Sequence, residues 1–223
     1  MRDTASWEEY YTDLKKLGRI MLWPDEFVVR FVNNEFKKRK INKVLEIGCG
    51  AGRHLSYLHK EGFTVTGTDV AQAAVKLAKK RLSSEKIYKV PVSVADGVNL
   101  PFKDASYDAV LGWRYLHVFD KKRIQNAVDE IYRVLKPKGV ALISTRTRKS
   151  TEFQNMRKGF KETRNFNYVA GQISKRALNG SYLTLPQIKS LFRNFSHLRV
   201  ERTEWTTQNL KTWESYWVIF AEK

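Results

Sequence analysis

The stretch VLEIGCGAGRHLSYL, from Val44 to Leu58, decides the fold of this chain. Its glycines occupy alternate positions, Gly48, Gly50 and Gly52, between an apolar run with β-branched residues and a run with helical spacing. A glycine-rich turn between a strand and a helix lets the backbone approach a ligand closely, because no Cβ atom stands in the way. The stretch therefore predicts a ligand-binding loop at the carboxyl end of a buried strand.

The composition is typical of a soluble globular domain. Of the 223 residues, 42% are hydrophobic and 13% aromatic, which is enough for a sizeable core. The one cysteine, Cys49, cannot form an internal disulfide, which fits a reducing compartment. The N-terminal MRDTASWEEYY lacks the apolar core of a signal peptide, and no run approaches the roughly 18 apolar residues of a membrane span. We expect a cytoplasmic protein without a membrane partner, as a monomer or a homodimer.

Positive charge is concentrated in the C-terminal third. The net charge is +18, and residues 145–202 hold 13 lysines and arginines against three acids. Residues 1–43 are closer to balance, with ten basic and seven acidic side chains. Such an excess is typical of a protein with an anionic partner, which is nucleic acid, a phosphorylated substrate or an acidic surface, but a solvated basic face has the same composition.

Strand and helix patterns alternate along the chain. Residues 6–39 have helical spacing. Short apolar strands are then predicted at 43–48, 63–69, 91–96, 107–113 and 139–145. Helices are predicted between them at 53–61, 70–84 and 120–136. This order predicts an α/β fold, a doubly wound, Rossmann-like parallel sheet with helices on both faces.

The regular order breaks after Thr145. Residues 147–182 are basic, polar and irregular, and they match no pattern that we can name. A helix is predicted at 185–195, and strands follow at 196–205 and 215–223. We expect these two strands to pair antiparallel at one edge of the sheet.

The loop does not fit a dinucleotide or a Walker site. The dinucleotide pattern is GxGxxG, whereas here Arg53 stands where its third glycine belongs, and no Gly-Lys-Ser/Thr follows. Glu46 would repel a pyrophosphate and suits a ligand with positive charge. Asp69 closes the second strand, where an acid can hold a ribose diol, and Asp96 closes the third, where it can accept from an adenine amino group.

At this point the chain resembles the class I S-adenosylmethionine-dependent methyltransferases, in particular the type 11 group. The resemblance covers roughly residues 43–145, and it rests on five ordered blocks: VLEIGCGAG, TGTD, VADGVNLPF, SYDAVLGW and IYRVLKPKGVALIST. It implies a seven-stranded sheet, mostly parallel with an antiparallel last strand, and S-adenosyl-L-methionine as the cofactor.

The resemblance also implies roles for single residues. Glu46 and the three loop glycines would surround the methionine part, Asp69 the ribose, and Asp96 with Gly97 the adenine. Gly112 and Trp113 would lie near the methyl sulfur. The predicted cofactor set is completed by Cys49, Arg53, Val70 and Tyr11.

Residues on the acceptor side are predicted from their place after the fourth and fifth strands. Arg114, Tyr115 and Arg146 are candidate substrate contacts, and His117 is the candidate general base. A packed or solvated role stays open for each of them. The side chains of Trp7, Tyr10, Tyr11 and Trp23 lie on the N-terminal helical region, which either folds over the cofactor as a lid or packs on the sheet.

The chain is predicted to be one methyltransferase domain. Its parts are an N-terminal helical lid (1–42), a cofactor-binding core (43–145), a variable basic substrate region (146–183) and a C-terminal helix and strand pair (184–223). The leading functional prediction is methyl transfer to an oxygen or nitrogen of a small-molecule acceptor, and the basic charge of the chain favours an anionic one.

The alternatives differ in acceptor and in class. VADGVNLPFKDASYDAV and EIYRVLKPKG also resemble the tRNA wobble-uridine methyltransferases, so a tRNA or RNA methyltransferase that uses the basic third is the second prediction. A non-catalytic partner subunit is disfavoured because the glycines and acids are intact. No Asn-Pro-Pro-aromatic motif follows the fourth strand, so the resemblance does not extend to enzymes that methylate DNA amino groups.

Overall fold

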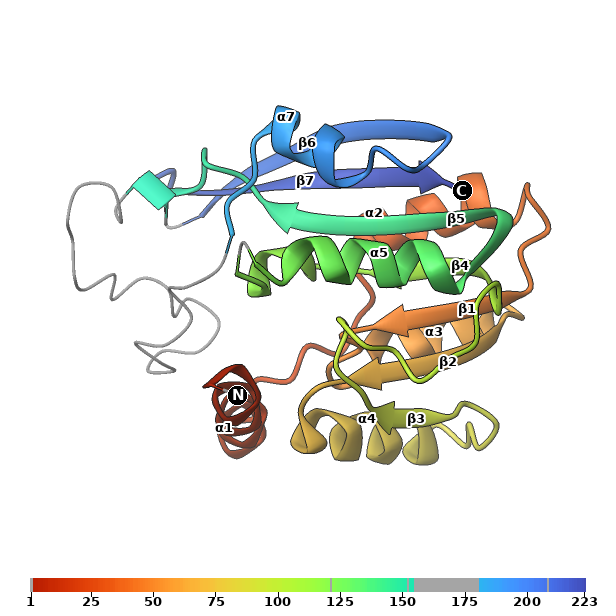
Figure 1. Ribbon diagram of the computed structural model, residues 1–223. Helices are drawn as coiled ribbons and strands as arrows, with labels where there is room; N and C mark the ends of the chain where they lie inside the picture. The colour runs from red at the N-terminus through yellow and green to blue at the C-terminus, as the bar shows by residue number, and fades with distance from the viewer. Residues whose placement is uncertain (1, 121, 152, 155–180, 208) are drawn as a thin grey trace.

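The computed structural model describes residues 2–120, 122–151, 153–154, 181–207 and 209–223. Its centre is a seven-stranded sheet in the order β3-β2-β1-β4-β5-β7-β6 (Figure 1). The strands are β1 (Lys43–Ile47), β2 (Thr64–Asp69), β3 (Val92–Val94), β4 (Tyr107–Gly112), β5 (Leu135–Arg146), β6 (His197–Thr207) and β7 (Thr212–Glu222). The predicted fold class is confirmed.

Strands β1 to β5 are parallel, whereas β7 pairs antiparallel with both β5 and β6. Strand order reverses at β1, which has β2 on one side and β4 on the other. In doubly wound sheets the ligand site lies at the carboxyl ends of the strands beside such a switch point. The glycine loop follows β1 and therefore stands at this point.

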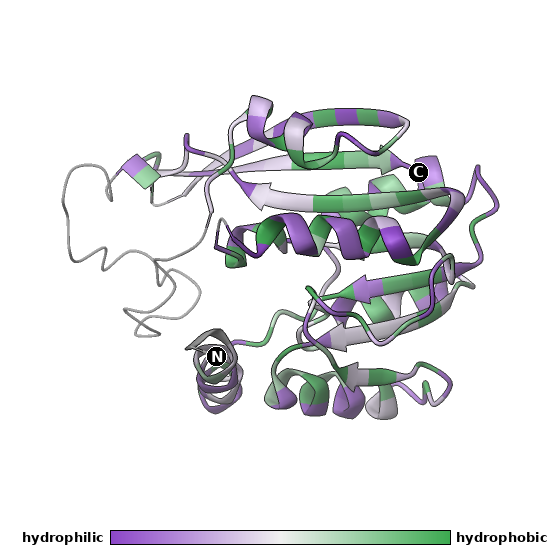
Figure 2. Cartoon of the chain, viewed as in Figure 1, coloured by the Kyte–Doolittle hydropathy of each residue, from purple (hydrophilic) through white to green (hydrophobic). Residues whose placement is uncertain are grey.

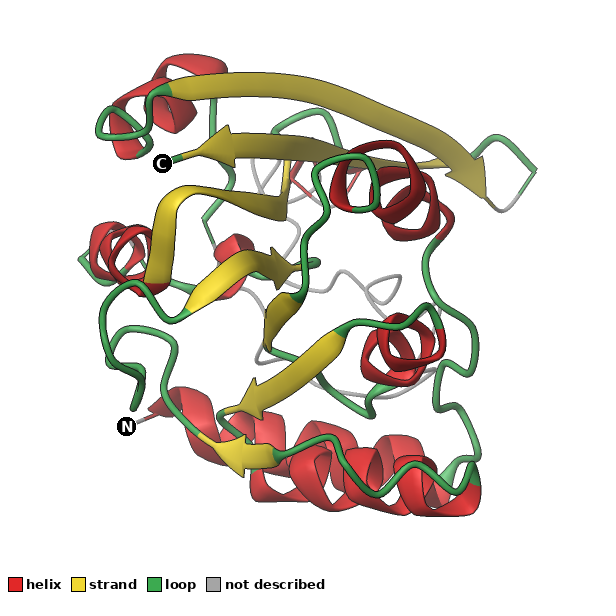
Figure 3. Cartoon of the chain, turned by 90° about the vertical axis from the view of Figure 1, so that its right-hand side faces the viewer, coloured by secondary structure: helices red, strands yellow, loops and turns green. Residues whose placement is uncertain are grey.

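Helices cover both faces of the sheet (Figure 3). They are α1 (Arg2–Lys16), α2 (Glu26–Phe31), a π-helical turn η1 (Val32–Phe36), α3 (Arg53–Lys60), α4 (Gln72–Ser84), a 3-10 turn η2 (Leu116–Val118), α5 (Ile124–Val134) and α7 (Leu185–Leu191). None of the described helices is long and apolar enough to cross a bilayer.

Two apolar cores follow from the alternation of side chains along the strands. Val44 and Leu111 face α2, α3 and α4, whereas Leu45 and Val110 face α5 and α7. Figure 2 shows the matching pattern on α5, where hydrophobic and hydrophilic residues alternate along the helix. Burial of the apolar side chains on both faces provides most of the driving force for folding.

Helix α1 lies beyond the tips of β1 and β2, at the carboxyl edge of the sheet (Figure 1). Glu8 fixes it there, because its Oε2 accepts the backbone N–H of Ala73 at the start of α4 over 2.9 Å. Arg81 of α4 donates to the carbonyls of Met21 and Leu22 behind α1. Helix α4 therefore holds both α1 and the connection that follows it.

Some element bounds differ from the sequence prediction. The helix expected over 120–136 ends at Val134, and β5 begins at Leu135, which has an extended backbone and pairs with Tyr107. Pro137 disfavours a helical Lys136, which explains the early end. The helical spacing predicted over 6–39 corresponds to α1 and to α2 with η1, and Trp23 lies in the connection between α1 and α2 with 81% of its surface exposed.

Candidate functional site at the carboxyl edge of the sheet

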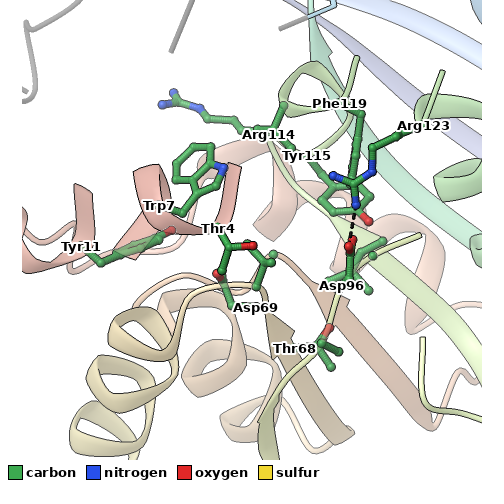
Figure 4. Close-up of a pocket in the computed structure, with 16 residues that line it drawn as sticks. Thr4, Trp7, Tyr11, Thr68, Asp69, Asp96, Arg114, Tyr115, Phe119 and Arg123 are labelled. Atoms are coloured by element: carbon green, nitrogen blue, oxygen red, sulfur yellow. Dashed lines mark hydrogen bonds and ion pairs between the residues drawn. The ribbon is translucent and has the colours of Figure 1, made fainter. Parts of the chain in front are cut away.

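A pocket of about 730 Å³, including the part that opens to solvent, lies between α1 and the strand ends (Figure 4). The sheet side contributes residues that follow β1, β2 and β3, among them Gly48, Asp69, Val70, Asp96 and Gly97. Helix α1 contributes Thr4, Trp7 and Tyr11, and the segment after β4 contributes Arg114, Tyr115, Phe119 and Arg123.

Asp69 closes β2 and has only 5% of its surface exposed. Its Oδ2 accepts the backbone N–H of Gly50 over 2.9 Å, and its Oδ1 accepts that of Ala71 over 3.0 Å. Burial raises the pKa of this carboxyl, and the donors at Ala71 and Gly50 oppose the rise. Each oxygen keeps a further acceptor position, so the carboxylate is able to bind two hydroxyls of one ligand.

The glycine loop needs its glycines for two different reasons. Gly50 has a φ of +55°, and a Cβ there would lie 2.7 Å from the hydroxyl of Tyr11 on α1. Gly52 precedes α3, and a Cβ there would lie 3.0 Å from the Cβ of Ala78. Gly50 therefore permits the contact with α1, whereas Gly52 permits the close packing of α3 on α4.

Tyr11 stands over the loop with a hydroxyl that stays protonated. Burial and the nearby Asp69 carboxylate raise the pKa of Tyr11 well above its ordinary value. Tyr11, which was predicted for the cofactor set, lies on the pocket wall. Cys49, by contrast, is buried in the core between the sheet and α3, and burial raises the pKa of its thiol well above the ordinary range.

Glu46 belongs to a buried polar chain behind the loop. Its Oε1 accepts from Nδ1 of His54 over 2.8 Å, and Nε2 of His54 accepts the backbone N–H of Asp25 over 3.2 Å. Because Nε2 accepts, the ring proton is on Nδ1 and the ring is neutral. Burial accordingly lowers the pKa of His54 and raises that of Glu46. The Oε2 of Glu46 has no partner within the described residues.

Asp96 is paired with a residue that the sequence analysis missed. Arg123, which precedes α5, donates from Nη2 to Oδ2 of Asp96 over 2.5 Å (Figure 4). Its guanidinium also lies over the ring of Phe119, 5.7 Å from the centroid. Asp96 is therefore held in place by the residue that precedes α5, and its position does not depend on a ligand alone. The pairing brings together parts of the chain that no local motif connects.

Tyr115 lies with the cofactor-side glycines, although its sequence position suggested a substrate contact. A Cβ built on Gly48 would lie 3.1 Å from its ring, and one on Gly97 would lie 1.7 Å from its hydroxyl oxygen. The ring packs edge-on against Phe119 at 5.0 Å. The hydroxyl is buried and has no partner in the described part of the chain.

Several predicted residues lie beside the pocket rather than on its wall. Gly112 is under Tyr115 and Ile143 in the core, and Trp113 stacks on Phe27 of α2 at 6.2 Å. Arg53 donates to the carbonyl of Trp23 over 3.1 Å and so holds the connection after α1. These positions support the pocket by packing.

The acceptor-side residues gather near the ends of β5 and β7. Arg146 is opposite Tyr216 in the register of these strands, and the ring of His117 meets Tyr216 edge-on at 6.5 Å. Burial, and then the charges of Arg146 and Arg114, lower the pKa of His117 well below its ordinary value. His117 is therefore neutral at pH 7. Most of the predicted substrate region, 155–180, lies outside the described residues.

Other pocket residues escaped the sequence analysis as well. Thr4, Val118 and Phe119 line the pocket without belonging to any motif block, and Thr68 and Ala95 line it from within two blocks in which no role was predicted for them. Trp7 was singled out only as an aromatic of the N-terminal helix. Its aromatic neighbours Tyr10 and Tyr11 gave the available signal, since three bulky rings on one helix indicate a face that covers something.

A seven-stranded sheet with an antiparallel last pair, a glycine loop after β1 and acids at the ends of β2 and β3 are the features on which the resemblance to the class I methyltransferases rests. The comparisons with known proteins agree. The sequence model of a family described as "Methyltransferase domain" matches residues 44–139. Together these findings support the predicted resemblance to the class I S-adenosylmethionine-dependent methyltransferases, and to their use of that cofactor, over this part of the chain.

Individual relatives are more distant. Methyltransferase GfsG of Streptomyces halstedii is 28% identical over 155 residues, which cover 59% of this chain and 54% of that protein. The mouse protein named "Probable tRNA methyltransferase 9B" is 32% identical over 135 residues, which cover 60% of this chain and 26% of that protein. The chain thus spans about half or less of the length of these two relatives.

Solved structures support the fold. A SAM-dependent methyltransferase of Methanosarcina mazei has a TM-score of 0.63 at 20% identity, covering 91% of this chain and 99% of that one. A structure from work on the conversion of a disulfide bond into a thioacetal group during echinomycin biosynthesis has a TM-score of 0.73 at 17% identity, covering 99% and 92%.

Proposed function

We propose that this protein transfers a methyl group from S-adenosylmethionine to an oxygen or nitrogen of a small-molecule acceptor. The observation that carries the proposal is the Asp69 carboxylate, which is fixed by two backbone donors and lines a pocket closed by α1. The partnerless Oε2 of Glu46 also fits a cofactor with a positively charged amino group. The residues present therefore suit this ligand.

The chain's own residues would bind the cofactor, orient it and exclude water from the site. The cofactor, when bound, supplies a methyl group on a positively charged sulfur. Asp69 would hold the ribose hydroxyls, Asp96 with Arg123 the adenine edge, and Glu46 the amino group. Trp7 and Tyr11 of α1 would cover the ligand and keep water away from the reacting atoms.

The acceptor side offers one neutral imidazole for proton transfer. The Nδ1 of His117 is buried and has no partner among the described residues. A neutral imidazole nitrogen is able to accept the proton of an attacking hydroxyl or amine. His117 does not line the pocket, so we propose it as the base only for an acceptor that reaches past Arg114 towards Tyr216.

RNA is the second candidate acceptor, favoured by the net charge of +18 and by the similarity to the mouse protein. The described basic strand β6 supports it less, because its arginines have acidic partners. Arg199 is paired with Glu35 over 2.9 Å, and Arg202 with Glu204 over 2.8 Å. These pairs remove much of the positive charge that an RNA backbone would need.

The test uses purified protein, methyl-labelled S-adenosylmethionine and two acceptor pools, total RNA and a small-molecule extract. Label in the extract alone supports the proposal, and mass spectrometry then identifies the acceptor. Label in RNA that nuclease releases supports the second candidate instead. An Asp69→Ala variant serves as the background control, since transfer that depends on the proposed site disappears in it.

A further inference from the structure

Arg114 stands at the edge of the pocket in a conformation that few arginines adopt. It follows β4 with a φ of +56°, a left-handed backbone that is uncommon outside glycine and asparagine. Its backbone N–H donates to the Oγ of Ser144 over 2.6 Å. Figure 4 shows its side chain extending away from Tyr115 and Asp96. With this backbone conformation, the side chain of Arg114 points away from the residues of the cofactor side.

An aromatic wall holds the guanidinium. Trp205 of β6 and Tyr216 of β7 stack at 5.4 Å with an angle of 11° between their planes. The guanidinium carbon of Arg114 lies 5.0 Å from the centroid of Tyr216 and 5.8 Å from that of Trp205. A guanidinium placed against aromatic rings keeps the N–H donors at its edge for a ligand.

Arg114 makes no ion pair with any residue of the described chain, and this sets it apart from a nearby arginine. Arg202, on the same strand pair, also lies over an aromatic ring, 5.8 Å from the centroid of Trp217, but it is bonded to Glu204 over 2.8 Å. The two residues share an aromatic support, and only Arg202 has a carboxylate partner. The positive charge of Arg114 is therefore available to an anion from outside.

A second positive charge lies close by. Arg146 ends β5, and the charges of Arg114 and Arg146 both act on Tyr10 of α1, where they oppose the rise in pKa that burial causes. Both charges also act on His117. The positive field is thus focused on one region, between α1 and the ends of β5 and β7, next to the pocket.

We propose that Arg114 recognises an oxyanion, a carboxylate or a phosphate, on the methyl acceptor, with Arg146 adding to the field. This inference rests on the proposed function and deepens it, because it assigns the acceptor to the class of anionic small molecules. The planar guanidinium accepts such a group in a two-point hydrogen-bonded geometry. Arg114 then orients the acceptor through a charged group that is separate from the atom that receives the methyl group.

The experiment compares three variants of the whole protein. Arg114→Asn removes the charge and tolerates the left-handed backbone, Arg114→Lys keeps the charge without the planar fork, and Arg202→Gln is the matched control. Binding of S-adenosylhomocysteine is measured first by calorimetry. Binding of inorganic phosphate and of acetate to the loaded protein follows, and the labelled product of the small-molecule extract is separated by anion exchange.

We expect saturable binding of at least one of the two anions by the wild type and by Arg202→Gln. The Kd should rise at least tenfold in Arg114→Asn and less in Arg114→Lys, and the labelled product should be retained as an anion. Preference for phosphate or for acetate identifies the group. Affinity for S-adenosylhomocysteine should be the same in all variants.

Three results would overturn the inference: no anion binding by the wild type, an equal loss in Arg202→Gln and Arg114→Asn, or a labelled product that is neutral or cationic. Each leaves cofactor binding intact. If the wild type fails to bind S-adenosylhomocysteine, the proposed function itself fails, so the two failures are distinguishable.

Discussion

The cofactor half and the acceptor half of the pocket are built in different ways. In the cofactor half, backbone groups position the Asp69 carboxylate. It accepts the N–H groups of Gly50 and Ala71, and all three residues belong to one short part of the chain. In the acceptor half, side chains from α1, the end of β4, and strands β6 and β7 meet around Arg114. The surroundings of Asp69 in the first half are fixed locally, whereas the second half exists only once both ends of the chain have folded.

Loss of the Asp69 carboxylate is the largest expected effect on the cofactor half. We expect Asp69→Ala to weaken S-adenosylhomocysteine binding more than tenfold, about 1.4 kcal/mol or more, because the ribose hydroxyls lose their acceptors and the loop loses its anchor at Gly50. Calorimetric titration measures the change.

The matched control is Asp13→Ala on α1, where a carboxylate makes only a weak surface pair with Lys16 at 3.8 Å. Its affinity should equal that of the wild type. Unchanged affinity in a folded Asp69→Ala variant would contradict the assignment of the cofactor half.

Gly50 tests how far the two halves depend on one another, because α1 belongs to both. Gly50→Ala should weaken cofactor binding and lower the free energy of unfolding by about 1–2 kcal/mol through its left-handed backbone. The added Cβ also meets the Tyr11 hydroxyl at 2.7 Å, whereas the ring carbon behind it is 3.4 Å away. Tyr11→Phe should therefore relieve the clash and leave the backbone strain.

A double-mutant cycle with Gly50→Ala and Tyr11→Phe measures this coupling in unfolding experiments. Gly18→Ala is the control for strain alone, because Gly18 has a φ of +63° and nothing lies within 4 Å of its Cβ position. If the two changes in the free energy of unfolding are additive, Tyr11 of α1 does not contact the loop at Gly50. A larger substitution such as Gly50→Val would damage folding as well as binding.

The difference between the halves also explains what the sequence could predict. Strands 1 to 5, the glycine loop and Asp69 were predictable because hydrophobic period and local motif encode them within short windows. The Arg123–Asp96 pair was not, since it joins residues 27 positions apart through a side chain of ordinary type. The wall of Trp205 and Tyr216 depends on the register of β6 against β7, which periodicity alone does not fix.

Tyr115→Phe distinguishes a packing role from a cofactor contact at the boundary between the halves. The hydroxyl is buried and has no partner among the described residues, so its removal should leave the free energy of unfolding equal or slightly higher. If the hydroxyl binds the cofactor, affinity for S-adenosylhomocysteine should fall a few-fold in the same variant. A clear loss of stability in urea unfolding would mean that the hydroxyl has a partner within the protein.

His117 gives an effect that is confined to acidic pH, and it reports the positive field of the acceptor half. Its pKa in the folded protein is well below the ordinary 6.5, so the unfolded chain binds a proton first as the pH falls. The free energy of unfolding should therefore decrease below pH 6.5, by up to about 1.4 kcal/mol per pH unit for this one group. Above pH 7 both states are neutral at this site and the contribution is constant.

Urea unfolding of the wild type and His117→Asn at pH 7.5, 6.5 and 5.5 isolates this contribution, because His54 and the carboxyl groups are common to both. The two curves should run parallel above pH 7 and separate below pH 6.5, where the wild type loses more stability. Adding Arg114→Asn to both proteins should narrow the separation, since the Arg114 charge helps to keep the imidazole neutral. If the curves of the wild type and His117→Asn are parallel over the whole range, His117 is exposed to water and its pKa is not lowered. If the separation is unchanged when Arg114→Asn is added, the charge of Arg114 does not act on His117.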